Sequence, residues 1–307
     1  MQFYDFKEIE ERVILIGVQT EQDEDVAASL DELEELAATA GAVTVGKVIQ
    51  NREAVHPGTY IGKGKIEEVA ALLAAYDANG VICDDELSPA QMNNLERELD
   101  CKVMDRTLLI LDIFAGRATT SEGKIQVELA QLRYRSARLV GLRESLSRLG
   151  GGIGTRGPGE KKLETDRRLI CTRISALKAE LAQVEKHREL IRGKRTRGNL
   201  KTAAIVGYTN AGKSTLLNRL TGAGILAEDK LFATLDPTTR SFTLADGQQI
   251  LLTDTVGFIN KLPHHLVEAF KSTLEEARYC DIVLNVVDCS DPQMDMHMHV
   301  VKETLRE

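Results

Sequence analysis

The residues with the clearest chemical potential lie at positions 207–215, with the sequence GYTNAGKST. This segment follows a short apolar run and precedes an amphipathic stretch, the strand, loop and helix context of a G-x-x-x-x-G-K-[ST] phosphate-binding loop. Glycines let backbone N–H groups approach phosphate oxygens, and the following helix directs its positive end at the same anion. We predict that Lys213 reaches the β- and γ-phosphates and that Ser214 binds Mg²⁺. A chance glycine turn is the alternative.

A second motif at residues 254–257 indicates the class of nucleotide-binding protein. An apolar strand is predicted to end in Asp254, and the sequence D-T-V-G begins there. In such proteins the strand-end aspartate holds the Mg²⁺ shell, and the glycine N–H can contact the γ-phosphate. Alone, these four letters could mark an ordinary turn. Placed one hairpin after the phosphate-binding loop, they predict a GTPase in which Lys213, a switch threonine and Gly257 are the catalytic residues.

The segment between the two motifs is expected to supply a threonine that completes the Mg²⁺ shell when GTP is bound. Thr234, Thr238 and Thr239 compete for this role. We prefer Thr234 because its separation from Ser214 best matches related GTPases. The predicted metal-binding set is therefore Ser214 and Thr234, with Asp254 in the second shell.

Length and composition set broad limits. A chain of 307 residues predicts two or three domains. The first residues do not resemble a signal peptide, and no apolar run approaches the length of a membrane span, so we expect no stable membrane insertion. The five cysteines lack C-x-x-C spacing, as expected of reduced thiols, which predicts a cytoplasmic protein.

The charge is distributed unevenly along the chain. Residues 117–201 carry 21 Lys and Arg against nine Asp and Glu, a net charge of +12, whereas the whole chain has a net charge of −8. A basic segment between acidic flanks suggests contact with a phosphate backbone, although solvated helical faces would give a similar count.

Strand and helix patterns alternate through the first third of the chain. Strands are predicted at 12–18, 42–50, 81–83 and 102–105, and helices at 29–40, 66–76 and 89–99. This alternation predicts a small, mostly parallel α/β domain over residues 1–115. The G-K-G-K sequence at 62–65 is read as a tight turn with surface lysines in preference to a phosphate site, and the acidic residues 84–86 are assigned no site.

Residues 116–198 are predicted to form a long antiparallel helical hairpin. Apolar residues at helical spacing mark the two helices, at 124–149 and 163–191, and the second follows a heptad pattern. Residues 150–160, with six glycines, join them. A basic, glycine-rich loop can mould itself to RNA, although it could also be a plain linker. The predicted RNA contacts are Gly151, Gly152, Gly154, Arg156, Gly157 and Gly159.

The motifs at 207–215, FATLDPT at 232–238 and DTVGF at 254–258, together with the glycine-rich segment 150–160, resemble the HflX family of translation-associated GTPases. The resemblance predicts a P-loop GTPase domain over residues 199–307. The predicted nucleotide contacts are Gly207, Tyr208, Thr209, Asn210, Ala211, Gly212, Lys213, Ser214, Thr215, Phe232, Ala233, Thr234, Leu235, Asp236, Asp254, Thr255, Val256 and Gly257.

This resemblance implies a GTP-hydrolysing factor, with Mg²⁺ as cofactor, that binds the large ribosomal subunit and its rRNA and splits or rescues stalled or idle ribosomes. Phe258 occupies the place where many GTPases have a glutamine that orients the attacking water, which predicts slow intrinsic hydrolysis. Asn210 matches an ion-coordinating asparagine of potassium-activated GTPases, so K⁺ is a candidate second cofactor.

No N-K-x-D sequence follows the strand predicted to end near Asp288. We therefore expect a chain truncated before the guanine-specificity motif, with an incomplete GTPase domain and weak nucleotide binding. A preference for guanine is therefore inferred from the motifs at 232–238 and 254–258 and from the resemblance. Two alternatives remain: an RNA-binding or remodelling factor whose GTPase domain is only regulatory, and an ATP-dependent enzyme.

Overall fold

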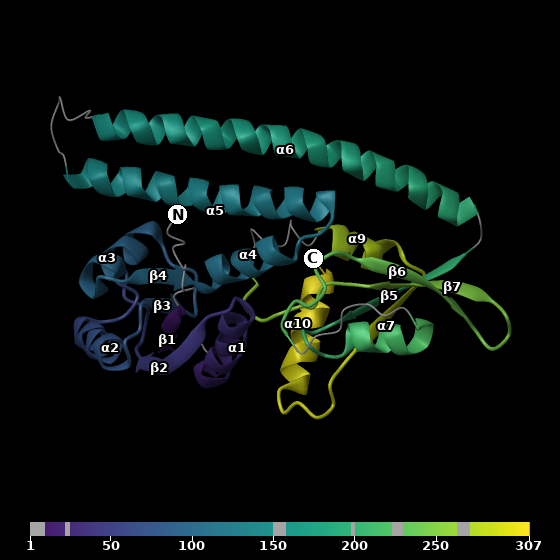
Figure 1. The fold of residues 1–307 in the computed structure, drawn as a ribbon, viewed down its shortest axis with the longest axis horizontal. Helices are drawn as coiled ribbons and strands as arrows, with labels where there is room; N and C mark the ends of the chain where they lie inside the picture. The colour runs from purple at the N-terminus through teal and green to yellow at the C-terminus, as the bar shows by residue number, and fades with distance from the viewer. Residues whose placement is uncertain are drawn as a thin grey trace, which may run out of the picture. The chain divides into compact units, whose positions relative to one another are not determined.

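The structure is a computed structural model that describes residues 10–21, 25–149, 158–197, 200–222, 230–262 and 271–306. It divides into two compact units, Met1–Ile110 and Leu111–Glu307. Each unit is built around its own four-stranded sheet (Figure 1). The prediction of an α/β protein is confirmed, whereas the three-part division at residues 115 and 198 stays a prediction.

The first unit is a parallel α/β domain, as predicted. Its elements in chain order are β1 (Arg12–Gln19), α1 (Val26–Thr39), β2 (Val43–Asn51), α2 (Lys63–Tyr76), β3 (Gly80–Cys83), α3 (Pro89–Leu99) and β4 (Lys102–Asp105). The strand order is β2-β1-β3-β4, and every neighbouring pair is parallel. Buried aliphatic side chains from these strands and helices form its core.

Side chains explain where α3 and the helix after β4 begin. Ser88 caps α3 in a reciprocal arrangement with Gln91. Asp105 Oδ1 accepts a 2.8 Å hydrogen bond from the N–H of Leu108 and so starts α4 (Arg106–Arg117) directly after β4. The sequence analysis did not predict α4, because its apolar residues run together at 108–111 instead of recurring at helical spacing.

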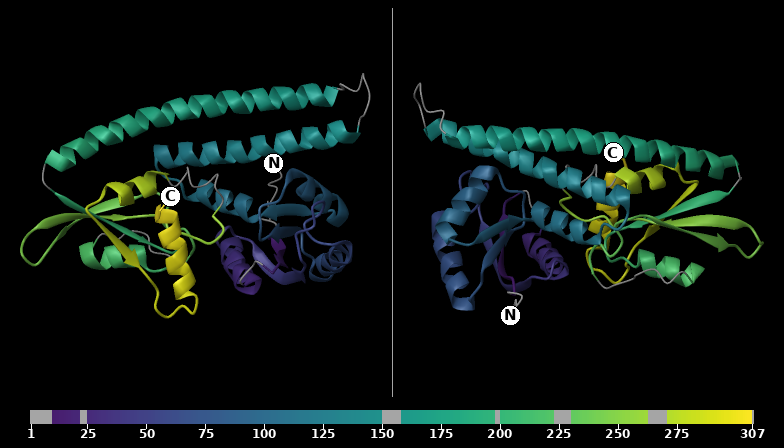
Figure 2. Two further views of the ribbon diagram at one scale, coloured as in Figure 1. Left: turned by 180° about the vertical axis from the view of Figure 1, so that it is seen from behind. Right: turned by 45° about the horizontal axis from the view of Figure 1, so that its top comes forward.

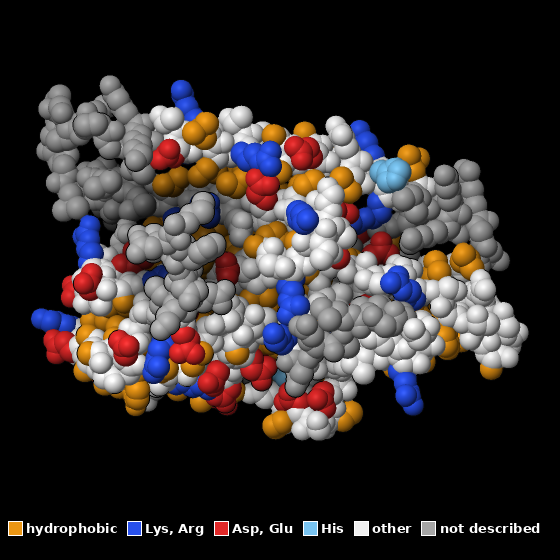
Figure 3. Space-filling model, viewed as in Figure 1, with side chains coloured by type: hydrophobic (Ala, Val, Ile, Leu, Met, Phe, Trp, Pro, Cys, Tyr) orange, Lys and Arg blue, Asp and Glu red, His pale blue; other side chains and the backbone are white. Residues whose placement is uncertain are grey.

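The second unit begins with the helical hairpin. Helices α5 (Ser121–Leu149) and α6 (Pro158–Arg197) run antiparallel, side by side (Figures 1 and 2). Apolar side chains follow the seam between them (Figure 3), and Leu177 is fully buried there. The connecting loop was predicted to extend to residue 160, whereas α6 already begins at Pro158. Proline is favoured in the first helical turn, where its missing N–H has no intrahelical role.

The rest of this unit is a second sheet with flanking helices. Its elements are β5 (Lys201–Gly207), α7 (Lys213–Thr221), β6 (Thr238–Thr243), β7 (Gln249–Asp254), α9 (Lys271–Tyr279), β8 (Ile282–Val286) and α10 (Met294–Arg306). The strand order is β6-β7-β5-β8, with β6 and β7 forming the predicted hairpin. Parallel β5 and β7 end side by side, which brings the two predicted motifs together. Among the described residues, no helix has the length and apolar character that spanning a membrane requires.

Candidate functional site

The loop between β5 and α7 has the backbone shape expected of a phosphate-binding loop. Asn210 and Gly212 have left-handed φ angles of 58° and 87°. Glycine adopts such values without a Cβ penalty, so Gly212 lets the chain turn sharply into α7. Lys213, Ser214 and Thr215 then form the first turn of that helix and line a pocket.

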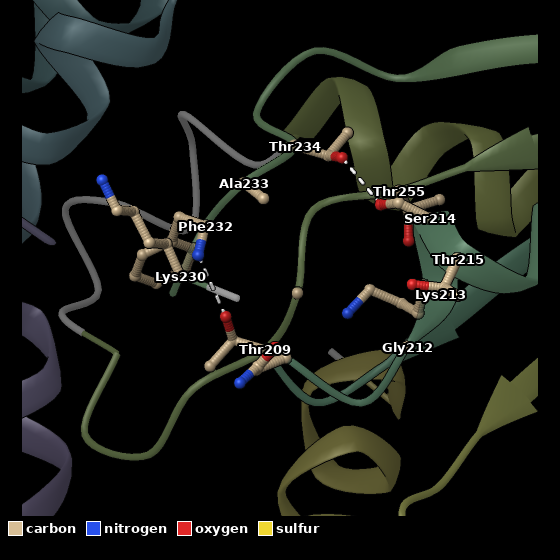
Figure 4. A pocket seen from close by; sticks show the side chains of 12 residues that line it. Thr209, Gly212, Lys213, Ser214, Thr215, Lys230, Phe232, Ala233, Thr234 and Thr255 are labelled. Atoms are coloured by element: carbon tan, nitrogen blue, oxygen red, sulfur yellow. Dashed lines mark hydrogen bonds between the residues drawn. The ribbon is translucent and has the colours of Figure 1, made fainter. Parts of the chain in front are cut away.

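Lys213 is the buried cation of this pocket, with only 6% of its surface exposed. Its Nζ donates a 2.6 Å hydrogen bond to the Tyr208 carbonyl, and its side chain extends toward the middle of the pocket (Figure 4). Burial lowers the pKa of Lys213 to about 8, although the nearby Asp254 carboxylate raises it in part. A buried ammonium group is costly without anionic partners, so the pocket favours an anion.

Ser214, Thr234 and Asp254 bring hard oxygen atoms together beside Lys213. Asp254 Oδ2 accepts hydrogen bonds from Ser214 Oγ at 2.6 Å and Thr234 Oγ1 at 3.1 Å, and the two hydroxyls lie 2.9 Å apart. Asp254 Oδ1 is buried and has no hydrogen-bond partner in the described part of the chain. Burial raises the pKa of Asp254, whereas the hydrogen bond from Ser214 and the charge of Lys213 lower it in part. These oxygens suit Mg²⁺, which prefers such ligands.

The pocket has a cavity volume of about 50 Å³. It is enclosed by the phosphate-binding loop, the segment around Thr234 and the strand end after Asp254 (Figure 4). The residues that line it are Thr209, Asn210, Gly212, Lys213, Ser214, Thr215, Lys230, Phe232, Ala233, Thr234, Thr255 and Gly257. All but Lys230 were predicted nucleotide contacts. Lys230 was missed, and its only signal in the sequence is a basic side chain just before the switch segment.

Other predicted nucleotide contacts do not line the pocket: Gly207, Tyr208, Ala211, Leu235, Asp236, Asp254 and Val256. The Tyr208 ring instead stacks on His297 of α10, with ring centroids 3.7 Å apart. The Asp236 carboxylate accepts hydrogen bonds from Thr119 and Thr120. Asp254 reaches the pocket through the Ser214 and Thr234 hydroxyls.

Gly257 lies against the phosphate-binding loop. A Cβ at this position would come within 2.9 Å of Lys213 Nζ and would also collide with the Thr209 backbone, so only glycine fits. The next residue, Phe258, pairs with the loop through its backbone, and its side chain is 1% exposed in the core beneath β5. Phe258 therefore presents neither a polar group nor its ring to the pocket.

The structure separates the three candidate switch threonines. Thr234 lies within hydrogen-bond distance of both Ser214 and Asp254. The Thr238 hydroxyl donates a 3.5 Å hydrogen bond to the carbonyl of Asp236, and the Thr239 hydroxyl lies 2.9 Å from that of Thr253 across the β6–β7 hairpin. The geometry thus favours the predicted choice of Thr234.

The predicted RNA contacts Gly151, Gly152, Gly154, Arg156 and Gly157 lie outside the described residues. Gly159, predicted to lie in the loop, is part of the first turn of α6. In the acidic segment 84–86, Asp84 forms a 2.8 Å ion pair with buried Arg106, and Asp85 accepts a hydrogen bond from Tyr60. Both contacts join residues of the first unit.

Three family models match consecutive parts of the chain. Residues 27–115 match a model described as GTP-binding GTPase N-terminal, and residues 117–195 match its middle region. Residues 202–307, which contain the pocket, match a model described as 50S ribosome-binding GTPase.

Curated relatives extend this likeness over nearly the whole chain. A GTPase HflX of Lacrimispora saccharolytica is 75% identical over 99% of this chain and 72% of its own length. The chain belongs to the HflX family of GTPases. The Escherichia coli HflX is 49% identical over 97% of this chain and 70% of its own. The chain thus spans about seven tenths of these HflX proteins.

A solved structure supports the same fold. The crystal structure of SsGBP in complex with GDP is 26% identical to this HflX-family chain, with a TM-score of 0.54. The match covers 96% of this chain and 78% of that one. The fold of this chain is therefore similar to that of a protein that was crystallised with GDP.

Proposed function

We propose that this chain binds GTP with Mg²⁺ in the pocket beside Lys213 and hydrolyses it to GDP and phosphate. The observation that carries the proposal is the convergence of one buried lysine, two hydroxyls and the Asp254 carboxylate beside the phosphate-binding loop. One oxygen of this carboxylate is buried and has no hydrogen-bond partner among the described residues. In this proposal Ser214 and Thr234 hold the metal ion, and Asp254 orients them from behind.

Each protein group has a distinct part in the proposed reaction. Bound Mg²⁺ would supply charge neutralisation on the phosphate oxygens. Lys213 places its ammonium on the β- and γ-phosphates and stabilises the charge that develops during transfer. The backbone N–H of Gly257 contacts the γ-phosphate, because the missing side chain lets this strand end approach the loop. Since Phe258 lies in the core, we propose that intrinsic hydrolysis is slow.

We further propose that the large ribosomal subunit is the partner, and that GTP binding is used to split or rescue stalled or idle ribosomes. The match of residues 202–307 to a 50S ribosome-binding GTPase model supports this proposal, as does the basic segment 117–201. The glycine-rich residues 150–157 and Gly159 are proposed to contact rRNA.

GTP turnover with and without purified large ribosomal subunits tests the proposal. Because the buried Phe258 cannot hydrogen-bond the attacking water, we expect stimulation on the order of 10²-fold or more. Deletion of residues 150–157 should remove the stimulation and leave basal turnover unchanged. Unstimulated turnover would contradict the ribosomal role, and ribosome splitting by a Lys213→Ala variant at the normal rate would favour an RNA-remodelling factor with a regulatory GTPase domain.

A K⁺ dependence of turnover is a separate prediction. Asn210 lines the pocket in a left-handed backbone conformation, and we propose that its side chain helps to bind K⁺ beside the phosphates. Turnover should then be faster in K⁺ than in Na⁺ at equal ionic strength, and an Asn210→Ala variant should lose this difference. Equal turnover of the unaltered chain in the two salts would contradict the prediction.

A further inference from the structure

Asp236 holds the start of the helical hairpin. Its Oδ2 accepts hydrogen bonds from the backbone N–H groups of Thr119 and Thr120, both at 2.9 Å, and from the Thr119 hydroxyl at 2.6 Å. Its Oδ1 accepts a further hydrogen bond from the Thr120 hydroxyl at 2.5 Å. Four donors from two consecutive residues therefore converge on one carboxylate at the point where the chain enters α5.

The first turn of α5 is shaped around this carboxylate. Thr120 caps the helix, because its Oγ1 accepts a 2.9 Å hydrogen bond from the N–H of Gly123. A side chain at Gly123 would collide with Asp236 Oδ1. Burial raises the pKa of Asp236, but hydrogen bonds from Thr119 and Thr120 outweigh this effect and hold the pKa below its usual value. The contact therefore favours an ionised carboxylate, which the positive end of a helix also stabilises.

The same short segment, residues 231–236, contacts the nucleotide pocket. Thr234, two residues before Asp236, forms the hydrogen bonds with Ser214 and Asp254. Phe232 donates its backbone N–H to Thr209 Oγ1 of the phosphate-binding loop at 3.1 Å (Figure 4). The Phe232 ring, 2% exposed, packs edge-on against Phe114 of α4 at a centroid distance of 4.8 Å. One segment of six residues thus joins the pocket to the residues that lead into the hairpin.

We propose that Asp236 is a positioning residue. By anchoring this segment to Thr119 and Thr120, it places the Thr234 hydroxyl where the metal ion and the γ-phosphate bind. The same contacts couple γ-phosphate binding to the conformation of the first turn of α5. The inference rests on the proposed GTP and Mg²⁺ site. Such coupling is reciprocal, so a γ-phosphate that engages Thr234 also stabilises the Asp236 contacts.

A second set of contacts involves the same helical turn. Arg188 of α6 forms ion pairs with Glu122 in the first turn of α5 and with Glu275 of α9, the latter at 3.2 Å. Helix α9 is the next described element after the strand end that carries Gly257. Arg188 therefore links the first turn of α5 to helix α9.

Nucleotide affinities of an Asp236→Asn variant test the inference. Binding of fluorescent GDP and of a fluorescent non-hydrolysable GTP analogue is measured with Mg²⁺ at up to millimolar nucleotide. Asp236→Asn should weaken the GTP analogue roughly 10-fold and GDP less than about 2-fold, since only the analogue offers a γ-phosphate to Thr234. Asp246→Asn, which removes the same charge at the β6–β7 turn, is the matched control and should bind both nucleotides normally.

A double variant distinguishes positioning from a general loss of structure. If Asp236 acts through Thr234, Thr234→Ala/Asp236→Asn should bind the GTP analogue no more weakly than Thr234→Ala alone. Additive losses, or equal losses for GDP and the analogue, would overturn the inference. Failure of the unaltered chain to bind either nucleotide would instead overturn the proposed function.

Hydrogen exchange in the unaltered chain gives a measurement that needs no variant. The N–H groups of Thr119 and Thr120 donate directly to Asp236, so a peptide over residues 115–123 reports on the contact. Exchange in this peptide should be several-fold slower with the GTP analogue than with GDP. Identical exchange in the two states would show that the first turn of α5 does not sense the γ-phosphate.

Discussion

GTP turnover is expected to fall by about 10²–10³-fold when Lys213 is replaced by alanine, the usual cost of removing one buried donor to a developing oxyanion. Lys213 is the buried cation at the centre of the pocket, and its ammonium is held 2.6 Å from the Tyr208 carbonyl. Alanine would remove the ammonium group that stabilises the transferring phosphoryl. The measurement is phosphate release at saturating GTP with large ribosomal subunits present.

The matched control is Lys302→Ala, which removes the same charge from the exposed face of α10. This variant should turn over GTP at the normal rate. A Lys213→Ala rate within about three-fold of the unaltered chain would contradict the assignment of Lys213, since a loss of one oxyanion donor is far larger.

The affinity for nucleotide should also depend on pH through Lys213. Burial lowers the pKa of its ammonium to about 8 in the absence of ligand, and bound phosphates favour the charged form and so raise this pKa. Binding therefore takes up a proton when the pH exceeds about 8, and affinity falls as the pH rises further, whereas near pH 7 the group is already charged in both states. Calorimetry at pH 8.5 in two buffers of different ionisation enthalpy would detect the uptake, which Lys213→Ala should lack.

The second large effect is on the stability of the first unit. Replacement of Arg106 by methionine should lower its free energy of unfolding by about 3–5 kcal/mol, because the change leaves buried carboxylates without their shared cation. Arg106 is 1% exposed and pairs with Asp84 at 2.8 Å and with Glu32. Asp84, itself fully buried, also accepts a 2.8 Å hydrogen bond from Ser29.

Urea unfolding followed by circular dichroism measures this loss, and hydrogen exchange in β3 and β4 assigns it to the first unit. Lys102→Met is the control, since it removes an exposed 2.8 Å pair with Glu11 and should cost less than about 1 kcal/mol. An Arg106→Met variant as stable as this control would show that the buried network contributes little to stability.

Much of this protein could be predicted from sequence because its strongest signals are local. The parallel first unit, the long helical pair and the phosphate-binding loop each depend on residue spacing within one segment, which fixes helical or strand periodicity and turn geometry. Lys213, Ser214 and Gly257 belong to such segments, and the structure places all three around the pocket. Helix α4 lacked a periodic pattern, and the sequence analysis missed it.

Tertiary structure decided what side chains from distant segments do. The sequence left three threonines open, and only the packing of residues 231–236 against the phosphate-binding loop brings Thr234 to Ser214. Asp236 was expected at the nucleotide, yet the start of α5, more than a hundred residues earlier in the chain, offers its carboxylate four hydrogen-bond donors. Motif spacing describes the backbone around a site, whereas the direction of a polar side chain depends on which distant donors the fold brings within reach, because hydrogen bonds from such donors stabilise a partly buried carboxylate.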